Sequence, residues 1–239
     1  HSLKVPASHY TSEAQNAVEI ELMFKQRPLL VALTPHIPNQ GDYLTHEAID
    51  TSLLLVRDRE DKARAYINAC RHRGARLVEG KGHKASFSCP FHAWNWGLDG
   101  KIIARPNSHE GFAAADDCFD RLVELPCYEI AGLIFVLLEG EDIELKVHAL
   151  MGASLPDIEN YNISETKHID SRTTELACNY KFFLDGFAET YHIASLHKQT
   201  ISPFYYSNST LVDQLGEVVH LVSPRKTIDK EFEKTQSEQ

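Results

Sequence analysis

The chain has 239 residues, of which 43% are apolar and 24% are charged. These fractions are typical of a globular protein and exclude disordered, collagen-like and coiled-coil chains. At roughly 100–200 residues per domain, the length allows one or two domains. Lys and Arg total 24 against 34 Asp and Glu, and the net charge of −10 argues against nucleic-acid and anionic-membrane partners. We expect a cytoplasmic protein, because the chain has neither a signal-peptide pattern nor an apolar run of the roughly 20 residues that span a bilayer.

The first part of the chain predicts one helix and then a series of short strands. Residues 13–26 have a helix-forming composition, and from residue 29 onward short apolar segments alternate with turns, as in small antiparallel β structure. A charged turn over residues 58–62 and an Asp-Gly pair at Asp99-Gly100 each predict a hairpin. The predicted strands are residues 53–56, 65–67, 94–96, 101–103, 122–125 and 133–138.

After residue 139 the pattern changes to a mixture of helical and strand-like segments. The predicted elements are helices over residues 144–151 and 181–196 and strands over residues 166–178 and 211–222. An antiparallel β region followed by a mixed region predicts an α+β chain, with a domain boundary between residues 140 and 155.

Two of the five cysteines stand out. An odd number of cysteines without a secretion signal argues against a disulfide framework. Cys118, Cys127 and Cys178 are expected to be free, buried thiols. Cys70 and Cys89 differ because each has a histidine close by in the sequence.

These two cysteines belong to a pair of short Cys-His motifs. Cys70 and His72 form Cys-x-His, and Cys89 and His92 form Cys-x-x-His. Two thiolates and two imidazoles are a complete ligand set for a metal centre, and a structural zinc site is one interpretation. Because each loop supplies one ligand of each kind, the pattern favours a binuclear cluster, with two thiolates on one iron and two imidazoles on the other.

A second group of metal-binding residue types lies between residues 179 and 197. On a regular helix Asp185, Glu189 and His192 fall within about 60° of one another and form a polar stripe among aromatic side chains. A solvated helix face is one interpretation of this stripe, and a metal site is the other. His192 and His197 are five residues apart, so both rings reach one metal only if the helix ends or distorts between them.

The first pair of motifs resembles a known cluster signature. "CRHRGARL" followed by "CPFHAW" resembles the Rieske [2Fe–2S] motif, with Ala93 where the family often has Gly. The resemblance implies that Cys70 and Cys89 ligate one iron and that His72 and His92 ligate the other. Respiratory Rieske proteins carry a disulfide between the two loops, whereas this chain has Ala75 and Phe91 at those places, which favours the oxygenase or ferredoxin branch.

The second stretch is similar to the iron-site signature of Rieske non-haem iron oxygenase large (alpha) subunits. By position His192 and His197 match two ligands of a mononuclear Fe(II), and Glu189 matches the carboxylate that links the two metal centres, where Asp is usual. Asp185 matches the other acidic position, and Tyr180 stands where Trp is common. "GFAETYHIASLH" resembles phenylpropionate-dioxygenase-type members in particular.

The resemblance implies an architecture with three segments. Residues 1–28 would pack with the catalytic domain, residues 29–145 would form an antiparallel β Rieske domain, and residues 146–239 would form part of an α/β helix-grip catalytic domain. The family's third iron ligand is an Asp far downstream, and neither Asp213 nor Asp229 matches its position. We therefore expect that the chain holds only part of the catalytic domain.

The resemblance also implies a function and partners. The chain would be the terminal oxygenase component that takes electrons from a reductase, with or without a ferredoxin, and uses O2 to hydroxylate an aromatic or related small organic substrate. The expected assembly is a homotrimer, alone or with a small subunit, in which Glu189 contacts His92 of an adjacent chain. An electron-carrying Rieske ferredoxin and a zinc-stabilised binding module are the alternatives, but both leave residues 150–239 without a role.

Overall fold

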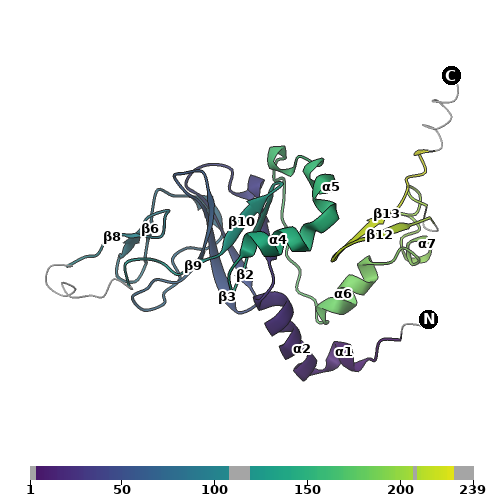
Figure 1. The fold of residues 1–239 in the computed structure, drawn as a ribbon, viewed down its shortest axis with the longest axis horizontal. Coiled ribbons are helices and arrows are strands. Elements are labelled where there is room, and N and C mark those ends of the chain that lie inside the picture. The colour runs from purple at the N-terminus through teal and green to yellow at the C-terminus, as the bar shows by residue number, and fades with distance from the viewer. Residues whose placement is uncertain (1–3, 108–118, 207–208, 229–239) are drawn as a thin grey trace, which may run out of the picture. The chain divides into compact units, whose positions relative to one another are not determined.

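The computed structural model describes residues 4–107, 119–206 and 209–228 (Figure 1). The chain divides into two compact units, which are treated separately below. The β unit comprises residues 17–149 and 155–171, and the helical unit comprises residues 1–16, 150–154 and 172–239. In the part of the chain that the structure describes, no helix has both the length and the apolar character needed to cross a bilayer.

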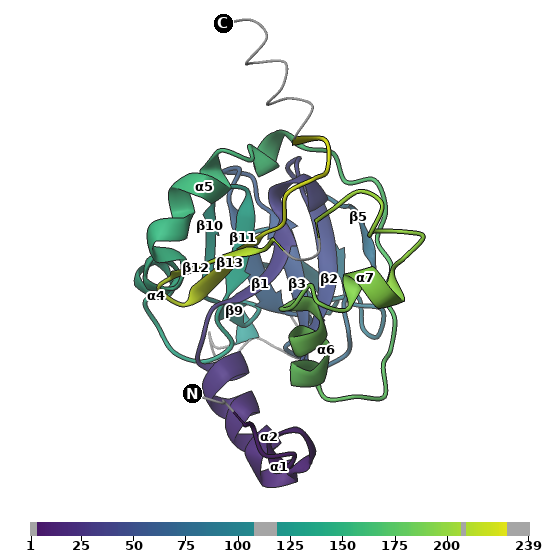
Figure 2. The same ribbon diagram turned by 90° about the vertical axis from the view of Figure 1, so that its right-hand side faces the viewer.

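The described residues of the β unit form three antiparallel sheets, which confirms the predicted antiparallel β structure. The five-stranded sheet has the order β5 (Lys81–His83), β2 (Asp42–Ala48), β3 (Thr51–Arg57), β4 (Ala63–Ile67) and β9 (Glu124–Leu125). The second sheet has the order β1 (Leu29–Leu33), β11 (Leu133–Val136) and β10 (Cys127–Ile130), and the third has the order β6 (Phe87–Ser88), β7 (Asn95–Trp96) and β8 (Ile102–Ala104). Figure 2 shows the strands of the five-stranded sheet and of the sheet that contains β1.

Strand β3 is the centre of this unit because both of its faces are buried. Leu53, Leu54, Leu55 and Val56 are each completely inaccessible to solvent. Since successive side chains of a strand point to opposite faces, they enter two different cores. Leu53 and Leu55 belong to the core against β1 and β11, whereas Leu54 and Val56 belong to the core that contains Cys70 and Cys89. The sequence Leu-Leu-Leu-Val thus fixes β3 between the second sheet and the cysteine loops.

A partly buried ion pair joins β3 to the second sheet. The Arg57 guanidinium donates two hydrogen bonds to the Glu129 carboxylate on β10, at 2.6 and 2.9 Å, and a third to the Ile37 carbonyl at 3.0 Å. Because the charged groups are paired with good geometry, the cost of burying Arg57 is offset.

Most of the elements predicted for this region are confirmed. The turn at residues 58–62 connects β3 to β4, and the turn at Asp99-Gly100 connects β7 to β8. The predicted N-terminal helix is α2 (Glu13–Glu19), which continues as a π-helix over Ile20–Lys25. The helix predicted over 144–151 is α4 (Ile143–Met151), and α5 (Leu155–Glu159) follows it.

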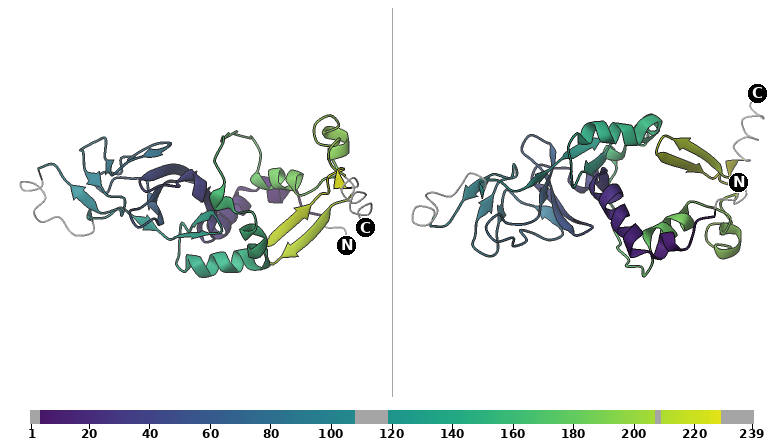
Figure 3. Two further views of the ribbon diagram at one scale, coloured as in Figure 1. Left: turned by 90° about the horizontal axis from the view of Figure 1, so that it is seen from above. Right: turned by 60° about the horizontal axis from the view of Figure 1, so that its bottom comes forward.

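The helical unit contains α1 (Ser8–Thr11), α6 (Tyr180–Phe187) and α7 (Ile193–Leu196). Its strands are β12 (Leu211–Leu215) and β13 (Val218–Val222), which form the antiparallel hairpin visible in Figure 3. The sequence predicts one strand over residues 211–222, but Gly216 adopts a φ of 71° and turns the chain back on itself.

Three further predictions for the second half of the chain are wrong. Residues 166–178 alternate like a strand, but they form neither helix nor strand and pair with no other strand among the described residues. Residues 181–196 are not one helix, since the chain leaves the helical conformation between α6 and α7. Cys178 is exposed rather than buried, and Cys118 lies outside the described residues.

Candidate metal centres

The first Cys-His motif lies in a tight loop after β4. The Cys70 N–H donates to the carbonyl of Ala75, five residues on, at 2.8 Å. The Gly74 N–H, four residues on, donates back to the Cys70 carbonyl at 2.8 Å. These two hydrogen bonds close the loop around the Cys70 side chain.

The second motif, after β6, repeats this construction. The Cys89 N–H donates to the carbonyl of Trp94, again five residues on, at 2.8 Å, and the Ala93 N–H donates to the Cys89 carbonyl at 3.0 Å. The two loops therefore present one cysteine and one histidine each from the same kind of turn, which is the arrangement that a binuclear cluster needs.

The two loops differ at the residue that closes the turn. Gly74 has a φ of 74° and Ala93 has a φ of 57°, so both lie in the left-handed region. A non-glycine residue in this region costs about 1–2 kcal/mol. We expect Ala93→Gly to raise the free energy of unfolding by about 1 kcal/mol. Chemical denaturation of the cluster-free protein measures this change. Ala75→Gly is the control and should show no gain.

The four predicted cluster ligands come together in the β unit. The Cys70 and Cys89 side chains are buried, and the His72 and His92 ring centroids are 4.7 Å apart. Burial raises the pKa of Cys70, and the nearby Cys89 thiol raises it further. Burial also lowers the pKa of His72, and the neighbouring His92 adds to this effect. Adjacent buried thiols and adjacent imidazoles are a donor set that fits a cluster of two irons.

Aromatic side chains surround the two histidines. The His72 ring stacks on Trp94, with centroids 4.8 Å apart and planes 6° from parallel, and the Arg105 guanidinium lies 4.8 Å from the Trp94 ring centroid. His92 is exposed and packs against Phe91, whose side chain is 59% accessible. The cysteines are thus on the inner side of the site, and the His92 edge is on the surface.

The helical unit holds the second predicted pair, His192 and His197. They flank the single-turn helix α7, as the residues immediately before and after it. Their ring centroids are 5.3 Å apart in an edge-to-face arrangement. A regular helix would point the two rings about 140° apart, but α7 ends at Leu196 and His197 has a non-helical φ of −107° and ψ of 35°. The helix therefore ends between the two histidines, as their spacing requires.

Glu189 organises this break. Its Oε2 accepts hydrogen bonds from the backbone N–H groups of Tyr191 and His192, and its Oε1 accepts one from His192 Nδ1. The hydrogen bond with His192 holds the pKa of the Glu189 carboxyl below its usual value. Because a carboxylate only accepts hydrogen bonds, Nδ1 carries the proton and Nε2 keeps a lone pair for a metal.

Asp185 takes part in a different contact. The Tyr10 hydroxyl, 175 residues earlier in the chain, donates to Asp185 Oδ2 at 2.5 Å, and this bond raises the pKa of Tyr10. Asp185 lies on α6, whereas Glu189 and His192 follow its last residue, Phe187. The three side chains therefore do not form the predicted polar stripe on one helix face. Asp213 lies on β12, and Asp229 is outside the described residues.

No three His, Cys, Asp or Glu side chains lie close enough together to hold a single metal ion within the described ranges. A binuclear cluster takes two protein ligands at each iron, so the loop ligands need no third group. A facial triad has two histidines and one carboxylate, and His192 and His197 would be its two histidines.

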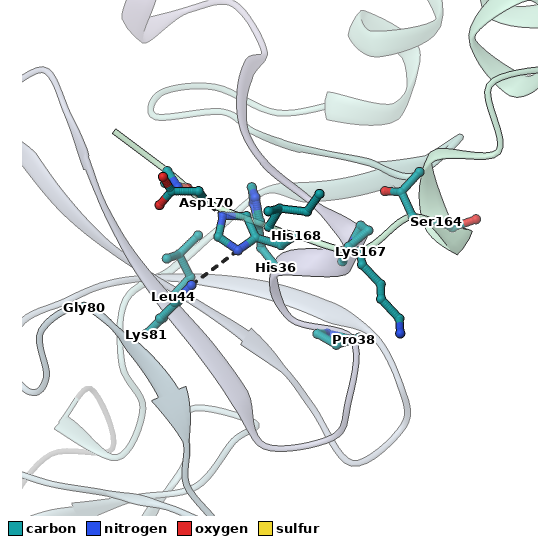
Figure 4. A pocket seen from close by; sticks show the side chains of 13 residues that line it. His36, Pro38, Leu44, Gly80, Lys81, Ser164, Lys167, His168 and Asp170 are labelled. Carbon is teal, nitrogen blue, oxygen red and sulfur yellow. Dashed lines mark hydrogen bonds between the residues drawn. The ribbon is translucent and has the colours of Figure 1, made fainter. Parts of the chain in front are cut away.

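The β unit also contains a large cavity. It has a volume of about 850 Å³ and includes His36, Lys81 and His168 of the β unit (Figure 4). Lys81 Nζ donates to His168 Nδ1 at 3.4 Å, the dashed contact in the figure, and His168 Nε2 lies 2.6 Å from Ser171 Oγ. None of the predicted ligands lines this cavity, and no motif in the sequence indicates it.

Comparison with known proteins identifies the family. Residues 28–129 match the Rieske [2Fe-2S] domain, and residues 159–236 match the catalytic domain of the ring hydroxylating alpha subunit. The chain belongs to the Rieske oxygenase alpha-subunit family. The predicted fold class is thereby confirmed, as is the assignment to non-haem iron oxygenases.

The relatives of this Rieske oxygenase chain include two oxygenase subunits. The carnitine monooxygenase oxygenase subunit of Escherichia coli K12 is 31% identical over 218 residues, covering 90% of this chain and 56% of the relative. The glycine betaine monooxygenase oxygenase subunit of Pseudomonas aeruginosa PAO1 is 27% identical, covering 84% of this chain and 46% of the relative. The chain thus spans about half the length of these relatives.

A solved structure supports the same relationship. The quaternary ammonium Rieske monooxygenase CntA in complex with its substrate L-carnitine superposes with a TM-score of 0.80 at 25% identity, covering 91% of this chain and 62% of that one. These relatives are named for quaternary ammonium compounds, so they do not support the predicted phenylpropionate-type grouping.

Proposed function

We propose that this chain is part of the oxygenase component of a two-component system that oxidises a small quaternary ammonium compound. The observation that carries the proposal is the His192 and His197 pair, oriented by Glu189, in the same chain as the Cys-His loops. A Rieske electron carrier needs only the two Cys-His loops, so it would leave His192 and His197 without a role. The substrate class comes from the names of the carnitine and glycine betaine relatives.

Each unit would hold one of the two metal centres. Cys70, Cys89, His72 and His92 would hold a [2Fe–2S] cluster, and His192 and His197 would hold Fe(II). When bound, these groups supply one-electron transfer and activation of O2. Glu189 fixes the His192 tautomer through its hydrogen bond with His192 Nδ1.

The proposed assembly is a homotrimer in which Glu189 reaches His92 of an adjacent chain. The exposure of both side chains supports it, because Glu189 and His92 are each accessible for a contact with another copy. A reductase would be the electron donor, since the relatives are named as oxygenase subunits, which implies a separate component that supplies the electrons.

A substrate panel tests the proposal. The complete polypeptide, with both metal centres loaded and a reductase supplied, is mixed with carnitine, glycine betaine or biphenyl, and O2 uptake and product mass are measured. We expect substrate-dependent O2 uptake and addition of one oxygen atom with a quaternary ammonium compound. Turnover of biphenyl alone would instead support an aromatic substrate, and reduction without any O2 uptake would support the electron carrier.

His192→Ala separates the oxygenase from the carrier at the level of metal content. We expect loss of the mononuclear iron with an unchanged cluster spectrum, because His192 belongs to the helical unit and the cluster ligands to the β unit. Iron and sulfide analysis together with EPR measures both centres. His220→Ala, on β13, is the matched control and should keep all the iron. Loss of the cluster spectrum in folded His192→Ala would contradict the two-centre assignment.

A further inference from the structure

The cavity drawn in Figure 4 has walls from two separate segments of the β unit. One wall is formed by the short 3-10 helix Thr34–His36 together with residues of β2 and β5. The other wall is formed by residues 164–171, called the strap below. The cavity volume of about 850 Å³ is within the range of small-molecule sites in proteins.

Both walls are anchored to the turn between β10 and β11. Gly132 in this turn has a φ of 81°, and a Cβ at this position would lie only 2.6 Å from the Ser164 backbone nitrogen. Glycine therefore permits the close approach of the first residue of the strap. The Gly132 carbonyl accepts a hydrogen bond from the Thr34 N–H at 2.9 Å, so the same residue also holds the 3-10 helix that carries His36.

Two histidines meet inside the cavity with defined tautomers. The His36 and His168 rings are edge to face, with centroids 4.8 Å apart. Since an ammonium group only donates, His168 Nδ1 accepts from Lys81 Nζ, and His168 Nε2 carries the hydrogen that is donated to Ser171 Oγ. Likewise the Leu33 N–H donates to His36 Nδ1 at 3.1 Å, so the hydrogen of the neutral His36 ring is on Nε2.

The cavity therefore contains donors whose hydrogens are not all used. Burial holds the pKa of His36 below its usual value, and the neighbouring His168 and Lys81 lower it further, so the neutral ring predominates at pH 7. Within the described residues the His36 Nε2–H has no acceptor. The Lys81 ammonium has three N–H groups and gives one to His168, which leaves two for a ligand.

The lining residues favour an anion with a single charge and an apolar part. Two lysines, Lys81 and Lys167, stand against one carboxylate, Asp170, which leaves a net charge of +1 when both histidines are neutral. An inorganic anion would leave most of the volume unfilled. The apolar lining suits an aliphatic chain and is supplied by Pro35, Pro38, Leu44 and Ile169.

We propose that this cavity binds a small organic monocarboxylate. Its carboxylate oxygens accept hydrogen bonds from the Lys81 ammonium and from His36 Nε2, and its aliphatic part lies against the apolar lining. Both donors contact the same His168 ring, so one ligand reaches both. This binding is separate from the proposed oxygenase function, because no predicted metal ligand lines the cavity and all its lining residues belong to the β unit.

Hexanoate is the probe for this site. Its dissociation constant for the complete polypeptide is measured by isothermal titration calorimetry and by ligand-detected NMR. We expect saturable binding in the millimolar range or tighter. Hexanamide, which has no charge, should bind roughly tenfold more weakly, because hydrogen bonds to a charged group are the stronger ones.

Three results with these probes would contradict the proposal. Absence of saturable hexanoate binding would show that the cavity is filled or closed in the complete polypeptide. Equal binding of hexanamide would show that the lysine charge is not used. Displacement of hexanoate by inorganic phosphate with a similar dissociation constant would show that the apolar lining contributes nothing.

Lys81→Met assigns the binding to this cavity. Methionine keeps an unbranched side chain and removes the ammonium group, so the dissociation constant should rise roughly tenfold or more. Lys84→Met is the matched control, because Lys84 is exposed, lies three residues further on and does not line the cavity. An equal loss in both variants would mean that positive charge attracts hexanoate in general, and an unchanged constant in Lys81→Met would place hexanoate elsewhere. Either result would overturn the proposal.

His36→Asn is a second variant that leaves Lys81 and its contact with the strap in place. The asparagine oxygen can still accept from the Leu33 N–H, but the side chain has no donor at the position of Nε2. We expect the dissociation constant to rise several-fold. Wild-type affinity in folded His36→Asn would show that the Nε2–H does not contact the ligand. These readouts need neither metal centre nor turnover, so a failure of the proposed oxygenase function would leave them unaffected.

Discussion

Cys70→Ser is expected to abolish the red-brown colour and the rhombic EPR signal of the reduced protein. The thiolate is the ligand, and a serine hydroxyl is a much weaker donor to iron that also leaves a polar group in a buried site. Because Cys70 is 3% exposed, no solvent ligand replaces it easily. Visible absorption together with iron and sulfide analysis after anaerobic purification measures the loss, which should be complete.

Cys178→Ser provides the matched control for this change. Cys178 is an exposed thiol in the helical unit, so the same substitution there should leave the cluster spectrum unchanged. A colourless wild-type protein that contains stoichiometric zinc would contradict the cluster assignment, because it would show that the two thiolates and two imidazoles hold a structural zinc ion.

The cluster loops could be predicted from the sequence because their determinants are local. Each cysteine lies two or three residues from its histidine, and the loop is closed by hydrogen bonds that reach only four or five residues along the chain. The strands that position the loops were also predictable, since the apolar run at 53–56 has to be buried on both faces.

The His192 and His197 site was harder to predict because a side-chain hydrogen bond ends the helix that the sequence pattern favours. The pattern of residues 181–196 favours one helix, but Glu189 accepts hydrogen bonds from two backbone N–H groups that would otherwise continue it. The contact between Tyr10 and Asp185 joins residues 175 positions apart, and neither residue carries a local signal of the other. The strand predicted over 166–178 was wrong for a related reason. A strand needs a partner strand to pair with, and its own sequence does not specify that partner.

Glu189→Gln is expected to slow turnover by about 10- to 100-fold while both metal centres stay loaded. The Glu189 carboxylate uses both oxygens, one for His192 Nδ1 and the other for the two backbone N–H groups. Glutamine offers one acceptor oxygen and one NH2 donor, so one of these donors would face another donor. The His192 ring would lose its fixed tautomer, and any link to His92 of an adjacent chain would lose its charge. Product formation and cluster reduction by the reductase are measured separately, and only the former should fall.

Asp185→Asn is the comparison that decides which carboxylate links the centres. Asp185 accepts from the Tyr10 hydroxyl, and asparagine keeps an oxygen that can accept this bond, so turnover should change little. Normal turnover in fully metallated Glu189→Gln, together with lost turnover in Asp185→Asn, would move the link to Asp185. Both substitutions remove one negative charge from the same ten-residue stretch and keep the side-chain size. A difference in turnover between the two variants therefore reports which carboxylate contacts a histidine. A fully active enzyme that stays monomeric would contradict the route between chains, whichever carboxylate proves to be the link.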